Sequence, residues 1–491
     1  MSDAVFLRKG VYHDSVALMR VSRALSGLPG TEVAVVAMAT ELNLELARDL
    51  GFALPAADPG DLLVALRGPD TTTAEQELDR HLAALSSAGP GPDGEQPPLT
   101  TRSAARRGAD LALVSVPGEH AFAEVMDAIE AGLPVMVFSD GVPVERERLL
   151  KERADERGVL VMGPDCGTAV VGGVGLGFAN VLRPGPVGLV AASGTGAQQV
   201  GCLLDLAGAG VSHVLGVGGR DLSAEVGGRS TVRALRMLDE DPATELIVLV
   251  SKPPDPGVAE RVRQVVASLR TPVVEALLGS GADLTTAAEA ALRALGRPVP
   301  AWPCWDGSGG TPSDTRHPRT PGDTAGGDPA RPTVRTAGGG PLVGVYSGGT
   351  LCAEAALIAG TGEFTDYGDD AYTRGRAHPM IDPTLRLEAL RRVPKDAVVL
   401  MDVVLGHAAD PDPAATLAPA LAALPAAAVV VALIGTEADP QDLRRQAAAF
   451  RDAGATVFAS NAQAARHAAR RAAAIHSASI HSASIHPGDL P

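Results

Sequence analysis

Aromatic residues are scarce in this sequence of 491 residues, where 2 Trp, 4 Tyr and 8 Phe amount to 3% of the chain. The hydrophobic core must therefore consist mainly of Ala, Val and Leu side chains. Basic residues are also in deficit, because 42 Lys and Arg stand against 58 Asp and Glu and give a formal net charge of −16. A general nucleic-acid-binding protein is not expected, since neutralising phosphates needs an excess of Lys and Arg.

Long hydrophobic runs and closely spaced cysteines are absent as well. No stretch of about 18 apolar residues free of charges and turn signals occurs, so no membrane span is predicted. The first residues, MSDAVFLRKGVYHDS, lack the basic and apolar regions of a secretory signal. The 4 cysteines form no C-x-x-C pair, which argues against a disulfide scaffold or a thiolate zinc site. We expect a cytoplasmic protein without a bound metal.

Gly and Pro, with 56 and 38 residues, are by contrast abundant. Many of them fall in two linker-like stretches at 87–98 and 306–340, which have too little apolar content to offset the entropy of ordering. The tail after about 474 repeats His-Ser-Ala-Ser-Ile. A repeated His tract can bind metal, whereas the alternative is a low-complexity tail with no role. We expect disorder over 301–340 and 471–491.

Between the linkers, short Val, Ile and Leu runs alternate with Ala-rich amphipathic segments of helical length. The runs are continuously apolar, as expected for parallel strands that are covered on both faces. They include 33–38, 111–116, 134–138, 159–162, 187–192, 246–250 and 397–404. This alternation predicts an α/β protein with several parallel-sheet domains.

An internal repeat adds detail to this prediction. Residues 187–200 (VGLVAASGTGAQQV) share a strand, a Ser/Gly/Thr turn and an Ala-rich segment with 343–355 (VGVYSGGTLCAEA). Further on, 241–256 resembles 394–413, and 271–283 resembles 427–439. Three matched blocks in the same order predict two copies of one α/β unit, at about 187–300 and 341–470.

The two Ser/Gly/Thr turns of this repeat are candidate anion sites. Each turn follows a predicted strand and opens a predicted helix, whose unpaired N–H groups and partial positive charge favour phosphate or carboxylate. The alternative is helix capping alone, because Ser and Thr are favoured N-caps. The candidate phosphate-binding residues are Ser193, Gly194 and Thr195 in the first turn and Ser347, Gly348, Gly349 and Thr350 in the second.

A charged segment at 366–386 (DYGDDAYTRGRAHPMIDPTLR) is the next candidate. Guanidinium groups, carboxylates and an imidazole in one Gly- and Pro-punctuated loop can clamp an anionic substrate and move protons. The alternative is a solvated surface loop with internal ion pairs. The candidate substrate-binding residues are Arg374, Arg376, Asp382 and Arg386, and His378 is a candidate acid–base group.

Two further residues follow predicted strands. Asp165, in Gly163-Pro164-Asp165-Cys166, lies beyond the strand at 159–162, where ligand pockets form in parallel sheets, and is a candidate for substrate binding. Cys166 beside it is expected to be a small buried thiol, with a nucleophile as the alternative. His407 follows the strand at 397–404 and could accept a phosphoryl group or act as an acid–base group, or it could be an ordinary loop residue.

Several of these segments resemble the succinyl-CoA synthetase superfamily. The block at 162–200 is similar to its α-subunit, in which Gly-Pro-Asn-Cys-Pro-Gly precedes a strand and a Ser-Gly-Thr turn. Residues 111–143 resemble the end of the CoA-binding domain, and 341–470 look more like the ligase domain of the β-subunit. Within the superfamily, the layout and the 366–386 segment look most like the FdrA family of acyl-CoA synthetase-like proteins.

The resemblance implies the order of the domains. A small α/β domain at 1–88 would precede a CoA-binding-like, Rossmann-type domain at 99–185. Two flavodoxin-like, succinyl-CoA synthetase-type ligase domains would follow, at 186–300 and 341–470, separated by the linker at 301–340.

The resemblance also implies a function. The protein would be an acyl-CoA ligase-like enzyme that handles an acyl phosphate or CoA intermediate of a small-molecule substrate at the paired helix starts. FdrA-type proteins have also been connected with oxamate carbamoyl transfer in allantoin and purine catabolism, so a carbamoyltransferase subunit using carbamoyl phosphate is the alternative. A non-catalytic binding subunit is a third possibility.

Two departures from the synthetase pattern qualify this function. Gly279-Ser280-Gly281-Ala282 stands where the synthetase α-subunit has its phosphohistidine loop, so a phosphohistidine relay is in doubt. No ATP-grasp domain fits the remaining chain, and an ATP-dependent step would therefore need another subunit. We expect an oligomer with separate partner subunits.

Overall fold

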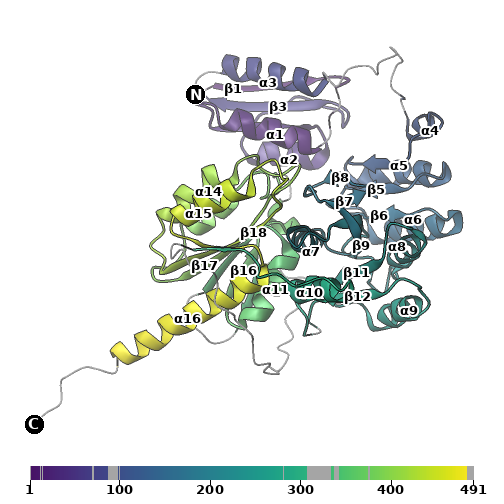
Figure 1. Ribbon diagram of the computed structural model, residues 1–491. Helices are drawn as coiled ribbons and strands as arrows, with labels where there is room; N and C mark the ends of the chain where they lie inside the picture. Colours follow the sequence, from purple (N-terminus) through teal and green to yellow (C-terminus); the bar gives the residue numbers. More distant parts are fainter. Residues whose placement is uncertain are drawn as a thin grey trace, which may run out of the picture. The chain divides into compact units, whose positions relative to one another are not determined.

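The computed structural model describes residues 2–11, 13, 15–68, 71–86, 98, 100–279, 281–306, 333–336, 342–373 and 376–483. The chain forms two compact units (Figure 1). The first comprises Met1–Asp165 and Thr373–Ala377, and the second comprises Cys166–Tyr372 and His378–Pro491. Among the described residues, no helix is long and apolar enough to cross a membrane.

The first unit begins with a three-stranded antiparallel sheet in the order β1-β3-β2. Its strands are β1 (Ser2–Arg8), β2 (Val33–Met38) and β3 (Leu62–Gly68). Helices α1 (Ser15–Ser26) and α3 (Thr71–Ser86) cover one face, and α2 (Glu41–Asp49) lies on the other. Because β3 runs antiparallel to both neighbours, β1 and β2 are parallel to each other and form a split βαβ unit.

The rest of the first unit holds a three-stranded parallel sheet, β4-β5-β6. Its strands are β4 (Ala112–Val114), β5 (Val135–Val137) and β6 (Val161–Met162), and its helices are α4 (Thr101–Ala105), α5 (Gly118–Glu130) and α6 (Val144–Arg157). A left-handed Gly158 ends α6, as is usual at a helix C-terminus. This arrangement corresponds to one half of a six-stranded doubly wound sheet.

The second unit contains two larger sheets, the first in the order β12-β11-β9-β10-β7-β8. Strands β9 (Pro184–Ala191), β10 (Val211–Gly216), β11 (Leu246–Ser251) and β12 (Val273–Leu277) are parallel, and the hairpin β7 (Thr168–Val171) and β8 (Val174–Gly177) closes one edge. The helices that follow the parallel strands are α7 (Gly194–Leu206), α8 (Arg229–Glu240), α9 (Pro256–Val266) and α10 (Leu284–Ala294).

The second sheet has the order β13-β19-β18-β17-β15-β16-β14. Its parallel strands are β15 (Leu342–Tyr346), β16 (Gly362–Asp366), β17 (Val398–Val404), β18 (Ala428–Ile434) and β19 (Thr456–Phe458). The edge strands β13 (Cys304–Trp305) and β14 (Thr333–Thr336) are antiparallel. Its helices are α11 (Gly349–Ala359), α12 (Asp370–Thr373), α13 (Thr384–Leu390), α14 (Pro413–Ala422), α15 (Leu443–Asp452) and α16 (Asn461–Ala483).

The predicted α/β fold with parallel sheets is confirmed, and the repeat is visible in the topology. The strands lie side by side in the equivalent orders β10-β9-β11-β12 and β16-β15-β17-β18. The three repeated sequence blocks fall on β9 and β15, β11 and β17, and β12 and β18. Of the stretches predicted to be disordered, 301–340 and 471–491, the residues 307–332, 337–340 and 484–491 lie outside the described residues, and the others belong in part to regular elements. Backbone pairing at the sheet edges orders β13 and β14, and α16, which packs on β17 and β18, continues as a helix to Ala483.

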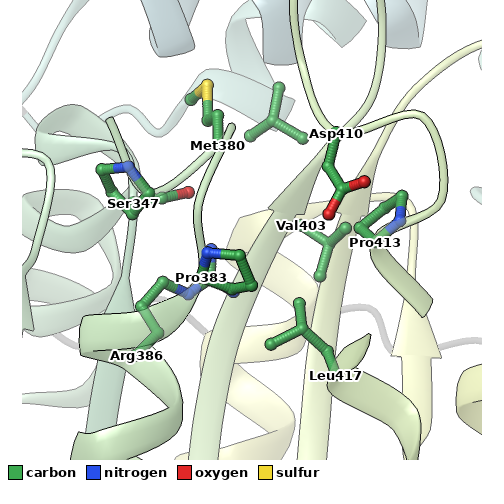
Figure 2. A pocket seen from close by; sticks show the side chains of 10 residues that line it. Ser347, Met380, Pro383, Arg386, Val403, Asp410, Pro413 and Leu417 are labelled. Atoms are coloured by element: carbon green, nitrogen blue, oxygen red, sulfur yellow. The ribbon is translucent and has the colours of Figure 1, made fainter. Parts of the chain in front are cut away.

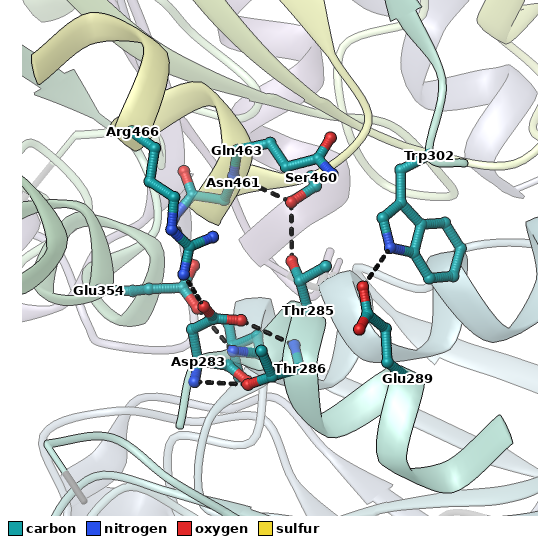
Figure 3. A network of polar contacts seen from close by, with 11 residues as sticks. Asp283, Thr285, Thr286, Glu289, Trp302, Glu354, Ser460, Asn461, Gln463 and Arg466 are labelled. Atoms are coloured by element: carbon teal, nitrogen blue, oxygen red, sulfur yellow. Dashed lines mark hydrogen bonds and ion pairs between the residues drawn. The ribbon is translucent and has the colours of Figure 1, made fainter. Parts of the chain in front are cut away.

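Helices α7 and α10 of the first copy pack against α11 and α16 of the second. This seam is tied by a buried polar network (Figure 3). Glu354 on α11 is 1% exposed and accepts hydrogen bonds from Leu284 N, at 2.6 Å, and from Asn461 Nδ2, at 2.7 Å. Arg466 on α16 pairs with Asp283, the N-cap of α10. A carboxylate of the second copy thus helps to satisfy the helix start of the first.

Candidate functional site

The first turns of α7 and α11 meet at the seam of the second unit. Ser193 is the N-cap of α7 and accepts a hydrogen bond from Gly196 N at 3.0 Å. Its hydroxyl donates to Thr350 Oγ1, in the first turn of α11, at 2.5 Å, although the two residues are 157 positions apart. The N-termini of both helices, with their unpaired N–H groups, therefore point to one place. The structure brings the two predicted turns together.

Gly348 determines how closely these helices approach. A Cβ atom added at this position would lie 2.6 Å from Thr195 Cγ2 and 2.8 Å from Thr195 Oγ1. The φ of Gly348 is −124°, a value open to any residue, so the glycine is required by the contact and not by the backbone conformation.

We expect Gly348→Ala to destabilise the second unit by about 1–3 kcal/mol, because the new methyl group must push α7 and α11 apart. Urea unfolding followed by tryptophan fluorescence measures this, since Trp302 and Trp305, the 2 tryptophans of the chain, both belong to that unit.

Gly219→Ala is the matched control, because its added Cβ would meet no atom within 4 Å and its effect should be small. Thr195→Gly should restore much of the stability lost in Gly348→Ala, since it removes the atoms of the collision. Equal losses in Gly348→Ala and Gly219→Ala would contradict the close approach of the two helices.

A buried ion pair, Asp402 with Arg386, lies beside Ser347 of the second turn. Asp402 in β17 is 0% exposed, and its Oδ1 accepts hydrogen bonds from Ser347 N at 2.8 Å and from Ser347 Oγ at 2.9 Å. Arg386 in α13, 2% exposed, lies with Nη1 3.5 Å from the same oxygen and donates from Nη2 to Asp402 O at 2.7 Å. The Ser347 hydroxyl therefore points into the protein.

Burial dominates the electrostatics of this pair. It raises the pKa of Asp402 despite the nearby Arg386, and it lowers the pKa of Arg386 despite the nearby carboxylates. Within the described residues, Asp402 Oδ2 and Arg386 Nε have no hydrogen-bond partner. A cavity of about 10 Å³ lies beside Arg386 and Ser347 (Figure 2). It has room for one water molecule and not for a substrate.

Asp366 and Lys252 bring a second pair of opposite charges to the start of α11. Asp366 ends β16, and its Oδ2 would be 2.6 Å from a Cβ added at Gly349, the first residue of the helix. Its Oδ1 accepts a hydrogen bond from Gly368 N at 2.9 Å. Burial raises the pKa of Asp366 to about 7, helped by Asp402, whereas the bond from Gly368 and the charge of Lys252 act to lower it.

His378 lies close to Gly368 and Asp366, and its imidazole is uncharged. Its Nδ1 accepts a hydrogen bond from Met380 N at 3.2 Å, so the ring proton is on Nε2. Burial, together with the positive charge of Arg386, lowers the pKa of His378 to about 4. A Cβ added at Gly368 would lie 2.8 Å from His378 Nε2, 3.1 Å from Asp366 Oδ1 and 2.4 Å from Ser347 O. Three polar atoms thus surround one glycine.

The segment 366–386 is not the single loop that the sequence predicts. It contains α12 and the start of α13. Asp382 accepts hydrogen bonds from Thr384 N at 3.0 Å and from Thr384 Oγ1 at 2.6 Å, just before and at the first residue of α13. Arg386 is consequently buried and not a surface clamp. Arg376 is exposed and, like Asp165, belongs to the first unit, whereas Arg374 lies outside the described residues.

His407 is exposed on the turn that follows β17. Its backbone N donates to Ala179 O at 2.8 Å, and its ring lies beside Gly175, so its contacts run to the end of the β7–β8 hairpin. Cys166 is buried, as predicted, and its thiol donates to Thr168 O at 3.5 Å. Across the described residues, no three His, Cys, Asp or Glu side chains form a group that could hold a metal ion.

Two residues of the site were missed in the sequence. Asp402 could have been found as a charge inside the apolar run AVVLMDVV, where only a paired carboxylate is tolerated. Lys252 directly follows β11, at the position in the first copy that corresponds to the turn after β17 in the second. Its proximity to Asp366 arises across the seam and leaves no trace in local sequence.

Two known domain families match parts of the chain. Residues 1–98 match the heavy metal-associated domain of AllF, and residues 345–471 match the family described as CoA-ligase. The second match covers β15 to the middle of α16, including the turn at 347–350.

Individual relatives extend the similarity over the whole chain. The uncharacterized protein YahF of Escherichia coli (strain K12) is 35% identical over 508 residues, covering 94% of this chain and 97% of YahF. Succinate–CoA ligase [ADP-forming] subunit alpha 2 of Archaeoglobus fulgidus is 31% identical over 181 residues, and the match spans 60% of that subunit. The malate–CoA ligase subunit alpha of Methylorubrum extorquens is 26% identical over 180 residues, again 60% of its length. This chain therefore belongs to the same family as YahF, within the CoA-ligase-like superfamily.

Proposed function

We propose that the second unit binds a phosphoryl group or an acyl phosphate between the first turns of α7 and α11, as part of an acyl-CoA ligase-like, FdrA-type reaction. The observation that carries this proposal is the hydrogen bond from Ser193 Oγ to Thr350 Oγ1, which holds two helix N-termini at one point. An anion placed there would receive backbone N–H groups and two hydroxyls in exchange for that mutual bond.

The surrounding side chains have complementary roles in this proposal. Lys252 supplies positive charge from the first copy, and the absence of a side chain at Gly194 lets a ligand approach the start of α7. His378, uncharged and protonated on Nε2, donates a hydrogen bond to the ligand and does not act as a base. Arg386 and Asp402 fix the turn at Ser347 from below and act as positioning residues.

The names of the relatives support a proposal for the substrates. The ligase subunits that the chain resembles are named for succinate and malate as acids joined to CoA, so a small carboxylic acid and CoA are the proposed substrates here. Those relatives are α-subunits, which supports a separate partner subunit for the nucleotide-dependent step. The small sheet β4-β5-β6 supplies one half of a nucleotide-binding fold, and we assign no individual residue to CoA. A cytoplasmic, oligomeric enzyme is part of this proposal.

Calorimetric titration with inorganic phosphate, acetyl phosphate and CoA tests the proposal. Ser193→Ala and Thr350→Val are each expected to weaken phosphate and acetyl phosphate binding about tenfold or more, because each removes one hydrogen bond to a charged ligand. Ser268→Ala, which removes a hydroxyl bonded to Val265 O far from both helix starts, should leave binding unchanged.

The same titration distinguishes the roles of the two histidines, and a transfer assay distinguishes the competing reactions. His378→Gln should weaken binding of the phosphate group, whereas His407→Gln should not. Absence of phosphate binding in the unmodified protein would overturn the proposal. Carbamoyl transfer from carbamoyl phosphate to oxamate without any need for CoA, measured with candidate partner subunits, would replace it by the carbamoyltransferase alternative.

A further inference from the structure

One carboxylate lies beside the start of α11, close to the place proposed for the ligand. Asp366 Oδ2 rests against Gly349, the first residue of α11, at the helix end that favours an anion. The carboxylate is held there by the bond from Gly368 N to Oδ1, at 2.9 Å. A ligand oxyanion at the same helix start would therefore face a second negative charge.

The groups that face Asp366 come from several elements. Lys252, after β11, lowers its pKa through its positive charge, whereas Asp402 in β17 and Asp369 in the turn after β16 raise it. Arg386 in α13 interacts with Asp366 as well, but is already paired with Asp402. Cys352 on α11 is buried, and its own raised pKa keeps it uncharged, as the lowered pKa does for His378.

The site contains buried polar side chains in addition to the helix N-terminus. Asp402 Oδ2 and Arg386 Nε are buried beneath the same turn, and within the described part of the chain they have no hydrogen-bond partner. Two buried polar atoms beside the turn thus keep hydrogen-bonding capacity that the described side chains do not use. Lys252, which follows β11 in the other copy, adds positive charge near the start of α11.

We infer that Asp366 acts as an internal stand-in for the anionic ligand, and that an oxyanion binds at the start of α11 only when the Asp366 carboxylate has taken up one proton. This inference rests on the proposed function, and it names the residue that makes binding at that site depend on pH. The proton comes from solvent and is released again when the ligand leaves, so the step is a simple uptake and release. Protonation removes the negative charge of Asp366, and the positive charge of Lys252 then acts on the ligand.

The direction of the pH dependence follows from linkage. Because the pKa of Asp366 is about 7 without ligand and a bound anion raises it further, binding takes up a proton above that pH. The association constant should then be nearly constant below pH 7 and fall about tenfold per pH unit above it.

Sulfate is the suitable probe, because its charge does not change between about pH 6 and about pH 9, whereas phosphate itself titrates there. Calorimetry with the full chain at constant ionic strength, in two buffers of different ionisation enthalpy, gives both the affinity and the number of protons taken up. At pH 8 we expect uptake of nearly one proton for each sulfate bound by the unmodified protein.

Asp366→Asn is the decisive variant, since it keeps an acceptor for Gly368 N without the charge. It should bind sulfate about tenfold more tightly than the unmodified protein at pH 8, with no proton uptake and no slope. Asp370→Asn, the same change at an exposed position nearby, should behave like the unmodified protein.

The outcomes separate the inference from the proposed function. Sulfate binding that is independent of pH, or a slope that persists in Asp366→Asn, overturns the inference alone. No sulfate or phosphate binding by either protein at any pH overturns both. The Gly368 amide resonance, whose donor bond ends on Asp366, adds a readout without ligand and should titrate near pH 7.

Discussion

Asp402→Ala is expected to destabilise the second unit by about 3–5 kcal/mol, the loss typical when one partner of a buried ion pair is removed. The substitution leaves the Arg386 guanidinium, 2% exposed, without its carboxylate. It also removes the acceptor of Ser347 N and Ser347 Oγ. Urea unfolding followed by the fluorescence of Trp302 and Trp305 measures the change.

Two further variants test the physical reason. Asp402→Asn keeps an oxygen for Ser347 and should lose clearly less than Asp402→Ala. Arg386→Met combined with Asp402→Ala should lose less than the sum of the single changes, because the double variant buries no unpaired charge. Strict additivity, or an Asp402→Ala loss below about 1 kcal/mol, would show that the pair does not contribute to stability.

Glu354→Gln is expected to remove a large part of the pH dependence of stability between pH 4.5 and pH 7. Burial raises the pKa of Glu354 from 4.5 to about 7, helped by Asp283, although the bond from Asn461 lowers it. Between these values the folded protein keeps a proton that the unfolded chain has lost, so stability falls as the pH rises and levels off above 7. The total is about 3 kcal/mol at 1.36 kcal/mol per unit of pKa shift.

The measurement is urea unfolding of the second unit at several pH values, compared between Glu354→Gln and the unmodified protein. The difference in unfolding free energy between the two should change steadily from pH 4.5 to 7. Asp366 contributes in the same direction and is present in both proteins, so it cancels in that difference. Glu225→Gln, an exposed glutamate, serves as the control and should give a constant difference. A constant difference for Glu354→Gln as well would contradict the raised pKa.

Local sequence was sufficient for the α/β class, the repeat and the two helix starts. Apolar runs such as LIVLVS at 246–251, repeated between Ala-rich segments, are typical of covered strands, and Ser193 before Gly194 is typical of a helix N-cap. These features depend on neighbours within a few residues. Local sequence also predicted that 366–386 is one charged loop, either a substrate clamp or a solvated surface loop, because charges and turn residues alternate there.

The tertiary structure decided what the site contains. The bond between Ser193 and Thr350, the burial of Arg386 on Asp402 and the approach of Lys252 to Asp366 each join segments of different strands or copies. Burial then changes the chemistry, since it keeps His378 uncharged and brings Asp366 close to half-protonation at neutral pH. Desolvation and pairing depend on distances in space, so composition and spacing can indicate which residues are available but not which of them meet.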